Sequence, residues 1–198
     1  MSFLGKVFNK LNPVKLAGDL IGGTLGKVVK IATTVVEGIA TGRKFGDILK
    51  DVAKQVAVLA IQAAVTYFTG GTAGLFINKL IDSAQGILGK VAAKVAASTL
   101  LSKTVTSWAA NKITEFSQSL TTDFVRKQLT DLVVKTLGLK DAQQQLEANA
   151  VKSEQLAQAI IRFFTEQAER SLSAEDRAQT LYTLDSSYRL QFSDGFDA

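Results

Sequence analysis

The side chains that most enzymes use for catalysis are scarce in this sequence. Its 198 residues include no cysteine and no histidine, which excludes thiolate nucleophiles, disulfides and imidazole bases or metal ligands. A Ser-His-Asp hydrolase therefore cannot be built. Carboxylates, lysines and tyrosines remain, and no spacing among them matches a catalytic set. We expect a protein that is not an enzyme, holds no cofactor and has no small-molecule substrate.

Two pairs of carboxylates stand close together, Glu166 with Glu169 and Glu175 with Asp176. Arginines at positions 162, 170 and 177 lie near them, so solvated ion pairs on polar helix faces explain both pairs. No acidic series has the spacing of a calcium-binding loop. We therefore expect no metal site.

Two glycine-rich segments look superficially like phosphate-binding loops, GGTLGK at residues 22–27 and GGTAG at 70–74. Neither has the spacing GxxxxGK[ST], and neither follows a predicted strand. Nucleotide binding is therefore not expected.

Positive charge is concentrated in the first half of the chain. Residues 1–100 contain 12 Lys/Arg and 5 Asp/Glu, whereas residues 101–198 contain 11 and 13. Such a surface can bind anionic lipid headgroups or nucleic-acid phosphates non-specifically, or it can simply keep a hydrophobic helix hydrated. Stacking aromatics are few among these cations and arginine occurs once, which favours lipid over nucleic acid. The cations concerned are Lys6, Lys10, Lys15, Lys27, Lys30, Arg43, Lys44, Lys50 and Lys54.

The chain begins MSFLGKVFNKL, in which apolar residues recur at spacings of one, three and four with lysines between them. This pattern predicts a short basic amphipathic helix. Eleven residues cannot span a bilayer, and so short a helix is marginal alone in water, so it needs a surface of lipid or of neighbouring helices. The lysines also interrupt any signal-peptide core, so no signal peptide is predicted. The predicted membrane-binding residues are Phe3, Leu4, Lys6, Val7, Phe8, Lys10 and Leu11.

Glycines recur every four residues in two places, which predicts close helix–helix packing, because small residues let backbones approach. Each interior helical glycine costs about 1 kcal/mol relative to alanine, so the repeats need such a reason. The alternative is that some of them, Gly42 and Gly46 especially, are helix caps and turns. The predicted packing positions are Gly18, Gly22, Gly26, Gly38, Gly42 and Gly46.

The elements that must position these residues are all helical, because β-branched residues occur at helical spacing among alanine and lysine. We expect an all-α fold with packed glycine- and alanine-rich helices followed by longer amphipathic ones. Asp47 is a plausible N-cap, and Thr122-Asp123 can cap a later helix closed by Gly138. The expected helices span residues 14–42, 48–68, 73–88, 90–108, 123–137, 141–170 and 174–184.

Composition divides the chain into three regions: a Gly/Ala/Lys-rich hydrophobic region (1–100), a polar amphipathic region (101–184) and a tail (185–198). Residues 55–78 carry no charge, and two interpretations stay open for them, a buried core or a helical hairpin that enters a bilayer. The tail, DSSYRLQFSDGFDA, is either a frayed end or an extended peptide that docks on a neighbouring subunit. Its predicted docking residues are Tyr188, Phe192 and Phe196.

The opening MSFLGKVFNKL, the glycine repeats and the glutamine-rich second half together resemble small internal, pilot or ejection proteins of tailed bacteriophages, and minor tail and baseplate proteins. The resemblance is compositional and covers mostly residues 1–100. It implies a protein carried in the virion, oligomeric with its own copies and other virion proteins, that enters or crosses the host envelope during genome delivery. The opening segment also resembles cationic antimicrobial helices. No functional residues are carried over.

Three functions follow as alternatives. The first is a virion protein of ejection or pilot type, oligomeric and membrane-active, located in the virion and in the host envelope on delivery. The second is a purely structural helical component of a tail, baseplate or capsid. The third is a pore-forming toxin or bacteriocin-like protein.

Overall fold

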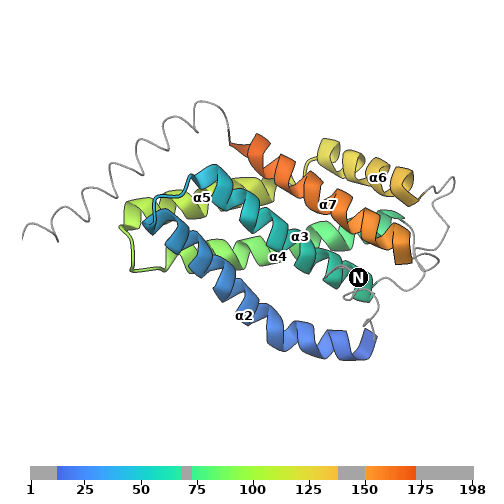
Figure 1. Ribbon diagram of the computed structural model, residues 1–198, viewed down its shortest axis with the longest axis horizontal. Helices are drawn as coiled ribbons and strands as arrows, with labels where there is room; N and C mark the ends of the chain where they lie inside the picture. The colour runs from blue at the N-terminus through green and yellow to red at the C-terminus, as the bar shows by residue number, and fades with distance from the viewer. Residues whose placement is uncertain (1–12, 68–72, 138–149, 173–198) are drawn as a thin grey trace, which may run out of the picture.

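The computed structural model describes residues 13–67, 73–137 and 150–172. Every regular element within these ranges is an α-helix, and none of their residues is in a strand, which confirms the all-α prediction. The helices pack side by side, as Figure 1 shows. They are α2 (Pro13–Ala40), α3 (Phe45–Tyr67), α4 (Ala73–Ala96), α5 (Lys103–Ser119), α6 (Asp123–Leu137) and α7 (Ala150–Ser171).

Helix α3 lies at the centre of the bundle and packs against α2, α4 and α7. A stripe of alanines at Ala53, Ala57, Ala60 and Ala64 is fully buried, because small side chains let neighbouring helices approach closely. Larger residues such as Ile48 on the same helix are also fully buried, and each contributes roughly 1.5–3 kcal/mol.

One hydrophobic core extends from α2 to α7. Specific contacts also join the two halves of the chain. The rings of Phe45 and Trp108 meet edge to face with centroids 4.7 Å apart, and the Arg126 guanidinium donates to the Asn78 side-chain oxygen at 2.6 Å. The change in composition near residue 100 is therefore not a boundary between separate cores.

The predicted break between residues 88 and 90 is wrong, because α4 continues from Ala73 to Ala96. Leu88 and Val91 stay buried on one continuous face, while Gly89 is exposed and needs no turn. The chain breaks instead at residues 97–102. Ser102 then caps α5 by accepting a hydrogen bond from the Val105 backbone N–H at 3.3 Å. Serine is one of the residues preferred at helix N-caps, which favours a helix start at this position.

The start of α6 agrees with the predicted cap, since the Thr122 hydroxyl accepts from the Val125 backbone N–H at 3.3 Å. Asp47 is not the N-cap of α3, which already begins at Phe45, and it lies in the first turn instead. A carboxylate there still interacts favourably with the helix dipole. Residues 138–149 and the predicted helix 174–184 lie outside the described residues.

The uncharged stretch 55–78 contributes its described side chains largely to the core. Val56, Leu59, Ile61, Phe76 and Ile77 are all buried there, as expected for the core interpretation. None of the helices in the described residues is both long and apolar enough to cross a membrane.

Among the predicted packing glycines, Gly38 lies at a close approach of two helices. A Cβ atom built on it would lie 2.9 Å from Cδ1 of Ile48, across the contact between α2 and α3. A Cβ atom built on Gly46, in the first turn of α3, would lie 3.9 Å from Cδ1 of Leu172, an ordinary contact distance. A Cβ at Gly26 meets no described atom within 4 Å, so Gly26 packs against nothing in this part of the chain.

Gly42 is a turn residue and not a packing position, so that prediction is corrected. It has φ 76°, a left-handed conformation that glycine adopts without strain. The backbone N–H of Gly42 donates to the Ile39 carbonyl at 3.0 Å, and that of Arg43 donates to the Gly38 carbonyl at 2.9 Å. This pair of bonds is the Schellman arrangement that ends α2.

Leucine substitutions at Gly38 and Gly26 are expected to have opposite effects on the free energy of unfolding. Gly38→Leu forces a side chain against buried Ile48 and should lower it by about 1–3 kcal/mol. Gly26→Leu, the matched control, removes a helical glycine without a clash and should raise it by up to about 1 kcal/mol. Urea unfolding followed by circular dichroism measures both. Equal stability of the two variants would contradict the close approach at Gly38.

Candidate functional site

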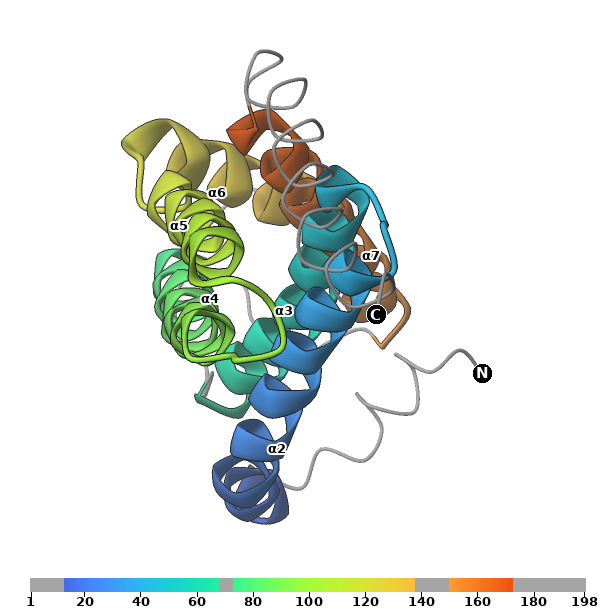
Figure 2. The same cartoon turned by 90° about the vertical axis from the view of Figure 1, so that its left-hand side faces the viewer.

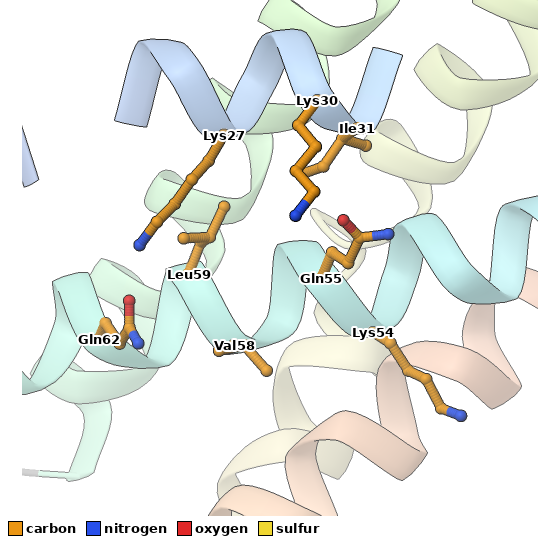
Figure 3. A pocket seen from close by; sticks show the side chains of 8 residues that line it. All are labelled: Lys27, Lys30, Ile31, Lys54, Gln55, Val58, Leu59 and Gln62. Atoms are coloured by element: carbon orange, nitrogen blue, oxygen red, sulfur yellow. The ribbon is translucent and has the colours of Figure 1, made fainter. Parts of the chain in front are cut away.

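A groove of about 340 Å³ lies between α2 and α3, and Figure 3 shows the side chains that line it. We call it the basic groove. Its lining residues are Lys27, Lys30, Ile31, Lys54, Gln55, Val58, Leu59 and Gln62.

Helical spacing brings these residues together. Gln55, Val58, Leu59 and Gln62 are separated by three, one and three residues, which places them on one face of α3. On α2, Lys27 lies four residues before Ile31, with Lys30 beside it. Ile31 and Leu59 are buried and Val58 is half-buried, so the floor of the groove is apolar.

The lysines supply the charge of the groove. Lys27 and Lys30 extend from α2 toward α3 on either side of Leu59, whereas Lys54 extends from α3 away from α2 (Figure 3). All three are exposed. No carboxylate in the described part of the chain forms an ion pair with any of them.

Neighbouring cations are different, because they are already paired. Arg43 binds Asp51 at 2.6 Å, and Lys50 binds Glu169 of α7 at 3.5 Å. The three lysines of the basic groove therefore differ from these neighbours, because no described carboxylate compensates their charge.

A second, polar hollow of about 390 Å³ adjoins the basic groove on the side of α7. Lys54 lines both hollows. The paired side chains just described contribute to it. Its lining residues are Arg43, Asp47, Lys50, Asp51, Lys54 and Thr165; we call it the polar hollow.

The groove forms where α2 diverges from α3. The helices run antiparallel, with Gly38 against Ile48 at one end and Lys27 beside Leu59 and Gln62 at the other. In this register α3 ends at Tyr67 before α2 reaches back to Pro13, so the first turns of α2 have no α3 residue opposite. Figures 1 and 2 show these turns lying apart from the other helices. Leu25 and Val29, which follow on α2, are 61% and 44% exposed.

The structure places the predicted site residues as follows. The N-terminal residues Phe3 to Leu11 and the tail residues Tyr188, Phe192 and Phe196 lie outside the described residues. Gly18 and Gly22 lie in α2. Residues 22–27 are part of the same continuous helix and not a phosphate-binding loop. Within the described ranges no cluster of acidic residues has the arrangement of a metal site.

Of the nine cations singled out in the sequence, the structure brings Lys27, Lys30 and Lys54 together in one groove. The glutamines and apolar residues opposite them were missed, because that stretch reads as core or membrane hairpin. The signal that could have found them is the polar pair Gln55 and Gln62, seven residues apart on one face of an otherwise buried helix.

Comparison of the chain with known protein families, with curated proteins and with solved structures finds no match. The arrangement itself can bind a negatively charged group at the lysines while an apolar portion of the same ligand lies on Ile31, Val58 and Leu59.

Removing one groove lysine is expected to stabilise the fold. Lys27 and Lys30 are three residues apart on α2, and like charges at such spacing cost about 0.2–0.5 kcal/mol. Lys30→Gln should therefore raise the free energy of unfolding by that amount at low salt, and the gain should shrink as salt screens the repulsion.

The matched control for this prediction is Lys127→Gln on α6. Lys127 has Asp123 and Asp131 four residues away on either side, so its loss should lower stability by a similar amount. Chemical denaturation at low and high salt measures both. A loss of stability in Lys30→Gln equal to that of the control would show that the groove lysine is compensated.

Proposed function

We propose that this protein is a bacteriophage virion protein of ejection or pilot type, oligomeric and membrane-active, whose basic groove and adjoining α2 bind anionic lipid during genome delivery. It performs no catalysis in this proposal. The observation that carries the lipid-binding part is the set of three lysines, which pair with no described carboxylate, above an apolar floor and beside the exposed Leu25 and Val29. The phage assignment rests on the resemblance in composition.

Lipid accounts for the groove better than nucleic acid does. Nucleic-acid grooves combine phosphate-binding cations with aromatic side chains that stack on bases, and none of the described residues that line this groove is aromatic or an arginine. An anionic lipid supplies both a headgroup for the lysines and hydrocarbon for the exposed apolar residues of α2. Each lysine near an anionic surface contributes about 1 kcal/mol to binding.

Neutralising the groove should weaken membrane binding strongly. Combined Lys27→Gln, Lys30→Gln and Lys54→Gln removes about 3 kcal/mol, which corresponds to roughly 100-fold weaker binding at about 1.4 kcal/mol per tenfold. Co-sedimentation with vesicles that contain phosphatidylglycerol, at low ionic strength, measures the change, and dye leakage from the same vesicles measures permeabilisation.

A variant with the same net charge is the control. Lys90, Lys94 and Lys103 are exposed lysines that do not line the groove, so their replacement by glutamine should leave binding near that of the unmodified protein. Equal losses of vesicle binding in the two variants would show that net charge alone, and not the groove, explains the effect. An unmodified protein that neither binds nor permeabilises anionic vesicles would end the membrane proposal.

A purely structural role in a tail, baseplate or capsid is the second candidate, and exposed apolar residues favour it. Leu75, Leu100 and Phe124 are 57%, 72% and 67% exposed, on α4, in the loop before α5 and on α6. Exposed apolar side chains mark a protein-contact surface where they form a contiguous patch, so this candidate requires that the assembly bring a partner against these side chains. This candidate shares the predicted oligomer with the first but requires no lipid.

Leucine at Gly18, Gly22 and Gly26 together is expected to reduce the size of the oligomer, because bulky side chains block the close approach that small residues allow. Sedimentation equilibrium of the full chain measures the mass. The control is Gly86→Leu combined with Gly89→Leu, at two glycines of α4 whose added Cβ meets no described atom within 4 Å. An oligomer of unchanged size in the first variant would remove the packing role of these glycines.

A further inference from the structure

The tail at residues 185–198 complements the chemistry of the basic groove. It contains three aspartates and one arginine, a net charge of −2, with Tyr188, Phe192 and Phe196 between them. The groove offers three lysines and an apolar floor. Charged and aromatic residues therefore alternate along the tail. The lysines of the groove complement the acidic residues in charge, and its apolar floor matches the aromatic ones.

The described chain ends close to the start of the same helix that forms the groove. Leu172 lies against Gly46, Glu169 pairs with Lys50 at 3.5 Å, and Thr165 lines the polar hollow with Lys54. Helix α7 therefore runs antiparallel to α3, and its last residues lie beside the first turn of α3.

The distance from there to the groove is within reach of the intervening chain. At 1.5 Å per helical residue, Lys54 and Gln62 lie about 12 and 24 Å along α3 from Gly46. Residues 173–184 span about 18 Å as a helix and up to about 40 Å when extended. The polar hollow lies between the end of α7 and the basic groove, and Lys54 lines both.

We propose that residues 185–198 dock in the basic groove of their own chain. The aromatic side chains lie on Ile31, Val58 and Leu59, and the aspartates meet the three groove lysines. The docked tail then competes with anionic lipid for the groove. The docking is independent of the membrane proposal, while the competition rests on it.

Disulfide trapping in the full chain tests the docking directly, because the protein contains no cysteine of its own. Val58→Cys with Phe192→Cys is expected to form a disulfide at least tenfold faster than Asn111→Cys with Phe192→Cys, in which the first cysteine is on the exposed face of α5. Non-reducing electrophoresis and intact mass show whether the product is a monomer.

A monomeric product that forms at this faster rate, and slows when Lys27→Gln and Lys30→Gln are added, supports the proposal. Equal rates for the two cysteine pairs overturn it. A product that is a disulfide-linked dimer also overturns it, and assigns the groove to the tail of a neighbouring copy.

Vesicle binding tests the competition. If the tail occupies the groove about nine-tenths of the time, releasing it should strengthen lipid binding about tenfold. Asp194→Asn with Asp197→Asn should show this gain, whereas Asp82→Asn with Asp131→Asn, which changes net charge equally at exposed positions, should not. Equal gains in both variants overturn the competition.

The two proposals fail in different ways. Trapping that succeeds in a protein without affinity for anionic vesicles keeps the docking and ends the membrane function. If vesicle binding depends on the groove lysines but the two cysteine pairs are trapped at equal rates, the membrane function is kept and the docking proposal is rejected.

Discussion

Helix α3 packs against three other helices at once, and its small side chains make this arrangement sterically feasible. Ala53, Ala57, Ala60 and Ala64 have no exposed surface, so one face of α3 is lined by small side chains that let the helix packed on it approach closely. Interiors are close-packed and respond to a change of even one methylene group. The positions of α2, α4 and α7 therefore depend on how closely each packs against α3. Gly38 extends the same principle to α2 at its contact with Ile48.

The basic groove is a consequence of how α2 leaves this central helix. Near Gly38 the helices touch, and farther along they separate enough for lysines to extend between them. Pairing would neutralise those lysines, as it does Arg43 and Lys50, yet no described carboxylate reaches them. Charge left uncompensated over an apolar floor is unfavourable for folding and favourable for binding an anion. Such a conflict between local stability and surface chemistry is common at functional sites.

Local signals in the sequence predicted the helices well and their interruptions less well. The Thr122 cap is a local feature, and it occurs as predicted. Gly89 misled the prediction, because an exposed glycine can stay helical when the residues around it are buried on one face. Gly42 and Gly38 lie four residues apart, yet one is a turn and the other a packing contact. The turn at Gly42 is a local feature of the helix end, whereas the contact at Gly38 depends on the position of α3, which is tertiary information.

The same reasoning explains why the groove was only half predictable. Lys27 and Lys30 were singled out by charge, but their partners on α3 belong to a stretch whose apolar character suggested core. The antiparallel register joins the two, and it also leaves the first turns of α2 without a partner on α3. Helix α2 thus contributes two of the three groove lysines, the exposed Leu25 and Val29, and the glycines at positions 18 and 22. A lipid surface, a docked tail and a second copy would all be contacted through α2, so their binding is expected to be coupled through this helix.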